Sequence, residues 1–362
     1  MARREGTLEN VVIESLEFFK KRRVLITGHT GFKGTWLTRI LLLAGAEIIG
    51  YSLDPPTCPS LYALTDTGSR IRSIHGDVRS FGSLNETLYD FKPEIVFHLA
   101  AQPIVRLSYD EPMDTYSTNV MGTVHILEAI RKSSSVRSFV NITTDKVYEN
   151  REWIWGYREN ETLCGFDPYS NSKSCSEMVT SSYRNSFFSD PDSTAISTAR
   201  SGNVIGGGDF AQDRIIPDCV RAIAAGRELL LRNPHSIRPY QHVLECLSGY
   251  LLLAMKQFEE KSYEGPYNFG PDEDGCVSTG TLVQMVFKEW GAGTWRIQGD
   301  GGPHEASFLK LDCSKAKNIL EWRPKWNIQQ AVAKTLIWTQ GYLSGENVDD
   351  LTDRQIMDYF NI

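Results

Sequence analysis

The chain has 362 residues, 41% of them hydrophobic and 23% charged, as expected for one large or two closely associated soluble domains. The formal net charge of −7 argues against a general nucleic-acid-binding role, and no run reaches the roughly 18 apolar residues of a membrane helix. Seven cysteines without a Cys-x-x-Cys pair, and histidines without a His-x-x-x-His pair, indicate reduced thiols in the cytoplasm and no metal site.

The first predicted elements are a short buried strand at 24–27 and a helix at 34–44, joined by a glycine-rich turn at 28–34. The turn has the spacing Gly-x-x-Gly-x-x-Gly. Glycines there permit a tight turn and let the backbone approach a pyrophosphate at the helix N-terminus. The alternative is a structural turn without a ligand. We predict a dinucleotide site that includes Gly28, Thr30, Gly31, Phe32 and Gly34.

Further strands are predicted at 46–52, 71–77 and 94–99, with a helix at 83–90. Asp54 lies just beyond the second strand, 20 residues after Gly34. There it would accept hydrogen bonds from the adenosine ribose and repel a 2′-phosphate, which favours NAD over NADP; the alternative is a loop aspartate. We also expect the ends of the next two strands to line the cofactor, through Asp77, Val78, Leu99, Ala100 and Ala101.

Helices at 114–132 and 168–188 alternate with strands at 138–143 and 195–200. This alternation predicts an α/β fold, a Rossmann-type doubly wound parallel sheet with a smaller C-terminal α/β substrate-binding lobe. Segments shorten and turns multiply after residue 201. We therefore expect residues 20–200 to form the NAD-binding domain together with a return segment at 241–262, and residues 201–240 and 263–362 to form the lobe.

Tyr169 and Lys173 stand four residues apart on a predicted helix, so they share one face, one turn apart. The lysine ammonium can stabilise a phenolate, which would let the tyrosine act as a base. A Thr-Thr-Asp-Lys segment, 143–146, ends the strand predicted before this helix. Because ligands bind at the carboxyl ends of parallel strands, we expect both groups at one site. For the Asp-Lys pair, the alternative is a surface ion pair.

Together these motifs resemble the extended short-chain dehydrogenase/reductase family of nucleotide-sugar enzymes, over nearly the whole chain from Arg23. Further matching segments lie at 98–103, 200–209 and 238–243. The pair Asp145-Lys146 discriminates within the family. The dTDP-glucose and GDP-mannose dehydratases have Glu after this Asp, whereas the CDP-glucose 4,6-dehydratase group has Lys, so the chain is most similar to that group.

The resemblance implies a tightly bound NAD and a nucleotide-sugar substrate. Tyr169, with a pKa lowered by Lys173 and the cationic nicotinamide, would take the 4-hydroxyl proton that Thr144 orients. Lys146 would then remove the C5 proton, and Asp145 would donate to the leaving C6 hydroxyl. The implied catalytic residues are Thr144, Asp145, Lys146, Tyr169 and Lys173, and Thr143, Tyr169 and Lys173 would also contact NAD.

The implied substrate-binding residues are Gln102, Asn203, Arg214, Arg232 and Arg238. A guanidinium fork suits a diphosphate, although each arginine alone could equally be a solvated surface residue. The resemblance also implies a homodimer that pairs the helix after Asp114 with the one after Pro168, and a place in deoxysugar biosynthesis for lipopolysaccharide O-antigen.

Three alternatives stay open. The enzyme could be a 4,6-dehydratase for a GDP- or UDP-linked hexose or heptose. It could be a nucleotide-sugar 4-epimerase or decarboxylase, which would keep Tyr169 and Lys173 but would not need Asp145-Lys146. It could also be a non-catalytic NAD-sensing protein on the same fold.

Overall fold

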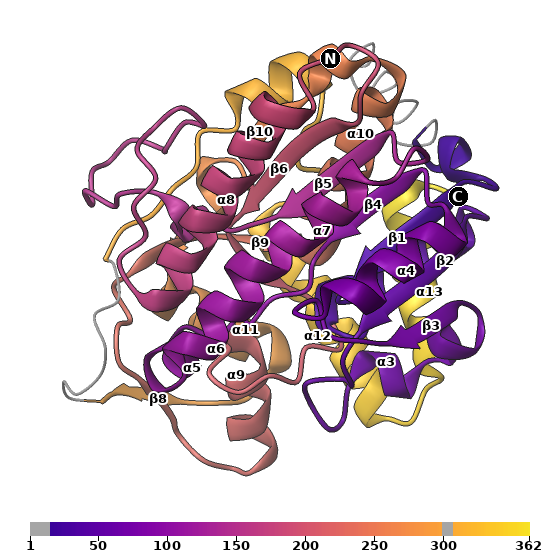
Figure 1. Cartoon of the computed structure of the whole chain (residues 1–362). Helices are drawn as coiled ribbons and strands as arrows, with labels where there is room; N and C mark the ends of the chain where they lie inside the picture. The colour runs from indigo at the N-terminus through magenta and orange to yellow at the C-terminus, as the bar shows by residue number, and fades with distance from the viewer. Residues whose placement is uncertain (1–14, 299–306) are drawn as a thin grey trace.

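A seven-stranded, wholly parallel sheet forms the centre of the protein (Figure 1). The computed structural model describes residues 15–298 and 307–362. The strand order is β10-β6-β5-β4-β1-β2-β3, and the order reverses between β1 and β4, as in a doubly wound fold. The predicted α/β class is therefore confirmed. The strands are β1 Arg23–Thr27, β2 Glu47–Ser52, β3 Arg72–His75, β4 Ile95–His98, β5 Ser138–Ile142, β6 Ala195–Ser201 and β10 Gly265–Phe269.

The two faces of the sheet are buried under different helices because successive side chains of a strand point to opposite faces. In β1, Val24 and Ile26 join the core under α2 (Phe32–Leu43) and α10 (Val243–Glu259). Leu25 joins the core on the other face, under α4 (Phe81–Phe91) and α7 (Gly122–Arg131). Figure 1 shows α4, α7 and α8 (Pro168–Phe187) in front of the sheet.

The helix predicted at 114–132 is interrupted. It begins earlier, as α6 (Pro112–Tyr116), passes through a π-helical turn at Ser117–Met121 and continues as α7. Within this turn the buried Asn119 accepts a hydrogen bond from the Gln102 N–H at 2.8 Å and donates to the Gln102 carbonyl at 3.1 Å. Such π-turns are frequent at functional sites. Here the hydrogen bonds of Asn119 hold the loop after β4 against the helix.

The smaller lobe has its own sheets and its own core. A three-stranded sheet has the order β11 (Cys276–Ser278), β9 (Ile237–His242), β7 (Asn203–Ile205), and β12 (Trp295–Ile297) pairs with β8 (Leu229–Leu231). Side chains of these strands pack on α9, α11 and α12. Further α-helices are α3 Leu61–Leu64, α5 Val105–Asp110, α9 Ile215–Ala224, α11 Thr279–Trp290, α12 Ile328–Leu343 and α13 Val348–Phe360.

Among the described residues, no helix has the length and apolar character needed to cross a membrane, and no group of three or more His, Cys, Asp or Glu side chains is placed to hold a metal ion. All seven cysteines lie in the described ranges and are free thiols.

Candidate active site

One cleft of about 1940 Å³ runs along the carboxyl ends of β1, β4, β5 and β6 and continues against the smaller lobe. Every residue predicted to bind cofactor or substrate lines this cleft, and so do the predicted catalytic residues except Asp145. The cofactor set is Gly28, Thr30, Gly31, Phe32, Gly34, Asp54, Asp77, Val78, Leu99, Ala100, Ala101, Thr143, Tyr169 and Lys173. The substrate set is Gln102, Asn203, Arg214, Arg232 and Arg238.

The glycine-rich turn is held in shape by close backbone approaches. Gly28 has a φ of +76°, and a Cβ there would lie 2.7 Å from the Ala100 nitrogen. A Cβ on Gly34 would lie 2.1 Å from the Gly28 carbonyl oxygen, so neither position tolerates a side chain. Gly31 is the N-cap of the 12-residue helix α2, and no side chain caps its free N–H groups. These groups at the cleft suit a pyrophosphate, so the turn fits a dinucleotide.

The acidic residues predicted near the adenosine have different surroundings. Asp54 is exposed and lies 3.2 Å from His75. Asp77 accepts hydrogen bonds from the backbone and guanidinium of Arg79, and these bonds lower the pKa of its carboxyl. Asp54 therefore keeps most of its carboxylate accessible for a ribose, whereas Asp77 is already occupied by Arg79.

Gln102 also lines the cleft, but both ends of its amide are bonded to protein. Its Nε2 donates to Thr115 at 2.9 Å, and its Oε1 accepts from the Ile104 N–H at 2.5 Å.

Helix α8 carries Tyr169 and Lys173 one turn apart. Asp167 caps this helix by accepting from the Ser170 N–H at 2.9 Å, and Pro168 occupies its first turn. In the chain by itself burial raises the pKa of Tyr169 to about 12, although Thr144 and the charge of Arg214 oppose the rise. The Lys173 amine donates to the Ile142 carbonyl at 3.1 Å, and burial, with Lys33 nearby, lowers its pKa to about 8.

In the chain by itself burial outweighs the neighbouring charges, and the fall expected from Lys173 together with the cationic nicotinamide stays a prediction. Arg214 still places positive charge near the phenol and favours its ionised form.

The segment 144–146 forms a short turn at the end of β5, where Thr144 accepts from the Lys146 N–H at 3.4 Å. Asp145 Oδ1 accepts from Thr144 Oγ1 and from Lys146 Nζ, both at 3.0 Å. Lys146 Nζ also lies 3.4 Å from Asn203 Oδ1. The Lys146 side chain is 31% exposed toward the cleft, whereas Asp145 is fully buried behind it. The structure therefore does not place Asp145 in direct reach of a ligand.

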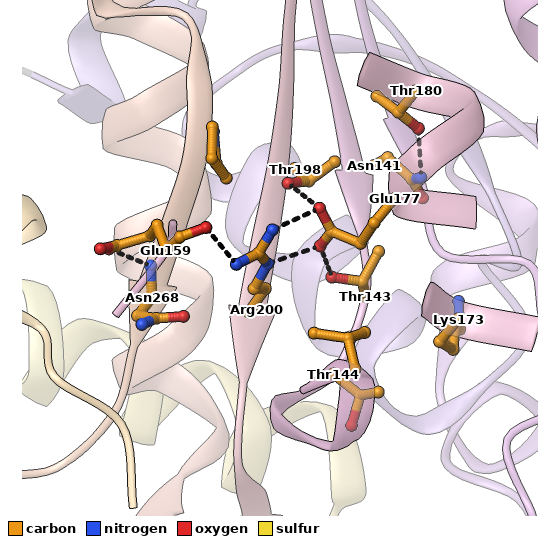
Figure 2. A network of polar contacts seen from close by, with 12 residues as sticks. Asn141, Thr143, Thr144, Glu159, Lys173, Glu177, Thr180, Thr198, Arg200 and Asn268 are labelled. Atoms are coloured by element: carbon orange, nitrogen blue, oxygen red, sulfur yellow. Dashed lines mark hydrogen bonds and ion pairs between the residues drawn. The ribbon is translucent and has the colours of Figure 1, made fainter. Parts of the chain in front are cut away.

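A buried ion pair supports this turn from behind (Figure 2). Glu177 of α8 and Arg200 of β6 are joined by two hydrogen bonds of 2.8 Å, and their side chains are only 2% and 3% exposed. Glu177 also accepts from Thr143 at 2.5 Å and from Thr198 at 2.7 Å. The pair thus ties α8, β5 and β6 together directly beside Thr144.

Three residues near the site were not assigned a role from the sequence: Lys33, Glu177 and Arg200. Lys33 lies inside the glycine-rich turn, and its Nζ donates to Ser201 at 2.9 Å. Its position within the glycine-rich motif could have indicated a role at the site. Glu177 follows Lys173 by one helical turn, but only the folded structure brings Arg200 to it.

The predicted arginines come from separate elements and meet at the cleft. Arg214 is the N-cap of α9, Arg232 follows β8, and Arg238 lies in β9. Arg232 lies 3.8 Å from Asp213, and Arg238 is mostly buried and donates to the Ile237 carbonyl at 3.0 Å. Their shared position on the cleft wall gives the smaller lobe an anion-binding character.

The fold and cleft define a dinucleotide-binding α/β protein of the Rossmann type, with a Tyr-Lys pair and an Asp-Lys pair near the end of one central strand. The family described as GDP-mannose 4,6 dehydratase matches residues 25–335, and the chain belongs to this family. The predicted membership of the extended short-chain dehydrogenase/reductase family is confirmed.

Among curated proteins, the CDP-glucose 4,6-dehydratase of Salmonella typhimurium is 47% identical over 351 residues, which cover 95% of this chain and 98% of that protein. Among solved structures, the dTDP-glucose 4,6-dehydratase of Streptomyces venezuelae, with NAD bound, is 24% identical, with a TM-score of 0.77 and coverage of 90% and 99%. An epimerase of Methanothermobacter thermautotrophicus is 19% identical, with a TM-score of 0.78 and coverage of 92% and 96%. The likeness to these two structures shows the fold alone.

Proposed function

We propose that this protein is a CDP-glucose 4,6-dehydratase, which converts CDP-glucose to CDP-4-keto-6-deoxyglucose with loss of water. The observation that carries the proposal is the 47% identity to the Salmonella enzyme of that name over 95% of the chain. The site supports it: Thr144 and Tyr169, which suit oxidation of a hydroxyl, lie beside an Asp145-Lys146 pair that suits an elimination. A 4-epimerase would have no use for this second pair.

The cofactor in this proposal is NAD. The α2 N-terminus with its glycine turn would hold the pyrophosphate, and Asp54 the adenosine ribose. When bound, NAD accepts a hydride from the sugar and returns it later in the same turnover, so it is not consumed. We propose that residues 20–200 with 241–262 serve this half of the cleft, and that residues 201–240 and 263–362 serve the nucleotide sugar.

In the first step Tyr169 takes the proton of the sugar 4-hydroxyl, and Thr144 orients that hydroxyl. The phenol of Tyr169 is buried and has a pKa of about 12, so its ionised form needs positive charge close by. Arg214 at the N-cap of α9 contributes such a charge, and Lys173, one turn along α8, would add to it.

In the second step the 4-keto group acidifies the C5 proton, and Lys146 removes it. Lys146 lines the cleft, and its Nζ is 3.0 Å from Asp145 Oδ1. The pair carries the same number of protons as an ammonium with a carboxylate or as an amine with a carboxylic acid. Transfer of one proton from Lys146 to Asp145 across this hydrogen bond therefore leaves Lys146 as a neutral amine. The pair can then supply a proton to the leaving C6 hydroxyl, with Asp145 acting from behind Lys146.

The substrate diphosphate would be held by Arg214, Arg232 and Arg238, and Asn203 and Gln102 would meet the sugar. Bidentate guanidinium contacts to phosphate are strong and directional, which suits orienting the glucose C4 toward Tyr169.

We propose a homodimer formed through α6, the following π-turn and α8. These elements expose large apolar side chains, with Met113 86%, Met121 46% and Met178 52% exposed. Apolar side chains this exposed are candidates for an interface. We further place the enzyme in the cytoplasm, where free thiols persist, and in deoxysugar biosynthesis for lipopolysaccharide O-antigen.

The test is a panel of CDP-, GDP-, UDP- and dTDP-linked hexoses incubated with protein and NAD and analysed by mass spectrometry. CDP-glucose should lose the mass of one water fastest. Tyr169→Phe should abolish the product while NAD binding, followed by calorimetry, persists. Water loss from another nucleotide sugar, or isomerisation without water loss, would contradict the proposal.

A further inference from the structure

One carboxylate oxygen joins the two lobes at the wall of the cleft. Asp213 Oδ1 lies 3.3 Å from Arg106 Nη1 and 3.8 Å from Arg232 Nη2. Arg106 belongs to α5, which follows β4 of the seven-stranded sheet, whereas Arg232 follows β8 of the smaller lobe. All three residues line the cleft. Guanidinium groups from both lobes therefore converge on a single anionic atom.

The contacts between this oxygen and the two arginines are loose. At 3.8 Å the contact of Arg232 with Asp213 is longer than a hydrogen bond. Within residues 15–298 and 307–362, neither the Arg106 nor the Arg232 guanidinium donates a hydrogen bond to a protein group. A guanidinium carries several N–H donors in a planar fork that matches the oxygens of a phosphate. The two arginines thus form an anion site that the protein's own carboxylate satisfies only in part.

Exposure allows the Asp213 carboxylate to leave this position. The side chain of Asp213 is 41% exposed, and those of Arg106 and Arg232 are 37% and 32% exposed. Ion pairs this exposed contribute little to stability, because water screens them and solvates the separated groups. Asp213 also has a φ of +57°, a left-handed conformation that aspartate adopts more readily than most residues. Neither burial nor strong pairing therefore fixes the carboxylate between the arginines.

We propose that Asp213 is a stand-in for a substrate phosphate. Its carboxylate lies between Arg106 and Arg232 until the nucleotide sugar binds, when the diphosphate displaces it and pairs with both guanidinium groups. Arg106 is thereby a substrate-binding residue from the lobe of the seven-stranded sheet, in addition to the arginines of the smaller lobe. The inference deepens the proposed function and rests on it, because its ligand is a nucleoside diphosphate.

The exchange favours a diphosphate over a ligand without phosphates. A diphosphate carries more negative charge and more acceptor oxygens than one carboxylate, so it can pair with both arginines at once. The arginine–carboxylate contacts that it breaks are exposed ones, so their loss costs little. A nucleoside without phosphates has no group that pairs with the two arginines, and it leaves Asp213 in place. The bridge therefore selects the diphosphate of the substrate rather than its base.

A second carboxylate nearby provides a matched control. Asp218 of α9 also lines the cleft, and it is close enough to sense the charges of Asp213 and Arg106. Its own partner is Arg221, which donates to Asp218 at 2.6 Å. Removing the charge of Asp218 therefore changes the electrostatic potential of the cleft in the same direction as removing that of Asp213, but leaves the bridge intact.

The experiment measures binding of CDP and of cytidine to the NAD-loaded enzyme by calorimetry, in wild type, Asp213→Asn, Asp218→Asn and Arg106→Gln. Asp213→Asn should bind CDP about three- to tenfold more tightly, because no exposed ion pairs have to be broken. Arg106→Gln should bind CDP about tenfold more weakly, the loss of one charge-assisted contact. Asp218→Asn should tighten CDP binding less than Asp213→Asn does. Cytidine affinity, NAD affinity and the circular dichroism spectrum should be the same in all four proteins.

A double variant separates the exchange from a general effect of charge. In the Arg106→Gln protein, Asp213→Asn should tighten CDP binding by a smaller factor than in wild type, since Asp213 then competes only for Arg232. If Asp213→Asn fails to tighten CDP binding, or tightens it no more than Asp218→Asn, the stand-in is refuted. CDP binding that Arg106→Gln leaves unchanged would remove Arg106 from the substrate site and overturn the proposal.

Binding and turnover distinguish this inference from the proposed function. A wild type that binds CDP but releases no water from CDP-glucose would contradict the proposed function, while the binding ratios above would still decide the exchange. A wild type that binds none of CDP, UDP, GDP and dTDP would overturn both.

Discussion

The ion pair behind the active site offers a direct test of how this fold is stabilised. Glu177 and Arg200 are almost fully buried, and the carboxylate accepts four hydrogen bonds, two from Arg200 and one each from Thr143 and Thr198 (Figure 2). Glu177→Gln keeps the shape of the side chain but removes its charge. The guanidinium of Arg200 would then lie buried without a counter-charge. The amide nitrogen, which cannot accept a hydrogen bond, would face donors that a carboxylate oxygen of Glu177 had satisfied.

Breaking one partner of a buried ion pair destabilises a protein by about 3–5 kcal/mol, because the other charge stays desolvated. We expect Glu177→Gln to lower the free energy of unfolding within that range. Glu128 provides a matched control, since it also makes a two-bond pair with an arginine, Arg131, but on the surface of α7. Exposed pairs contribute up to about 1 kcal/mol, so Glu128→Gln should be nearly neutral.

The assay is urea unfolding of the three proteins followed by fluorescence and circular dichroism, repeated from pH 7 downward. Its hydrogen bonds and Arg200 hold the pKa of Glu177 below the value of a free glutamate. Its contribution is therefore fully present above the unfolded pKa and is lost as pH falls through the folded pKa. The difference between wild type and Glu177→Gln should shrink at acid pH. A loss at pH 7 no larger than that of Glu128→Gln would refute the reasoning.

Three further predictions follow from the site and the core. Lys146→Ala should stop water loss and the incorporation of solvent deuterium at C5, seen by mass spectrometry, and retention of C5 exchange would assign the base elsewhere. Burial raises the pKa of Glu245 to about 7, so the contribution of Glu245 to stability should fall by about 3 kcal/mol as pH rises from 4.5 to 7. The difference in urea unfolding between wild type and Glu245→Gln should change with pH in that direction, and a difference that does not change with pH would contradict this. Arg238→Gln should weaken CDP binding about 10- to 100-fold, the loss of one charged hydrogen bond, but leave cytidine binding unchanged in calorimetry; equal weakening of both would place Arg238 away from the phosphates.

The tertiary structure decided how the predicted residues are used. Asp145 and Lys146 are adjacent in sequence, yet packing against Gly202 buries one while the other faces the cleft. In the chain by itself the pKa of Tyr169 rises, because burial depends on what surrounds the helix. Glu177 and Arg200 are 23 positions apart, so their ion pair forms only in the folded chain. The strand β10 was not predicted, since its place at the sheet edge depends on pairing with β6.

The sequence by itself determined the features that are local along the chain. Runs of apolar residues marked the first six strands, and glycine spacing marked the turn before α2, because each depends on a few consecutive residues. The motifs at 28–34, 143–146 and 167–173 pointed to the family that the comparison confirms. Nearly all the site residues proposed from the sequence line one cleft. The boundaries of the two lobes and the roles of the individual residues stay predictions. Burial, ionisation and long-range pairing were decided only in the folded chain, because each depends on segments that meet in space but are distant in sequence.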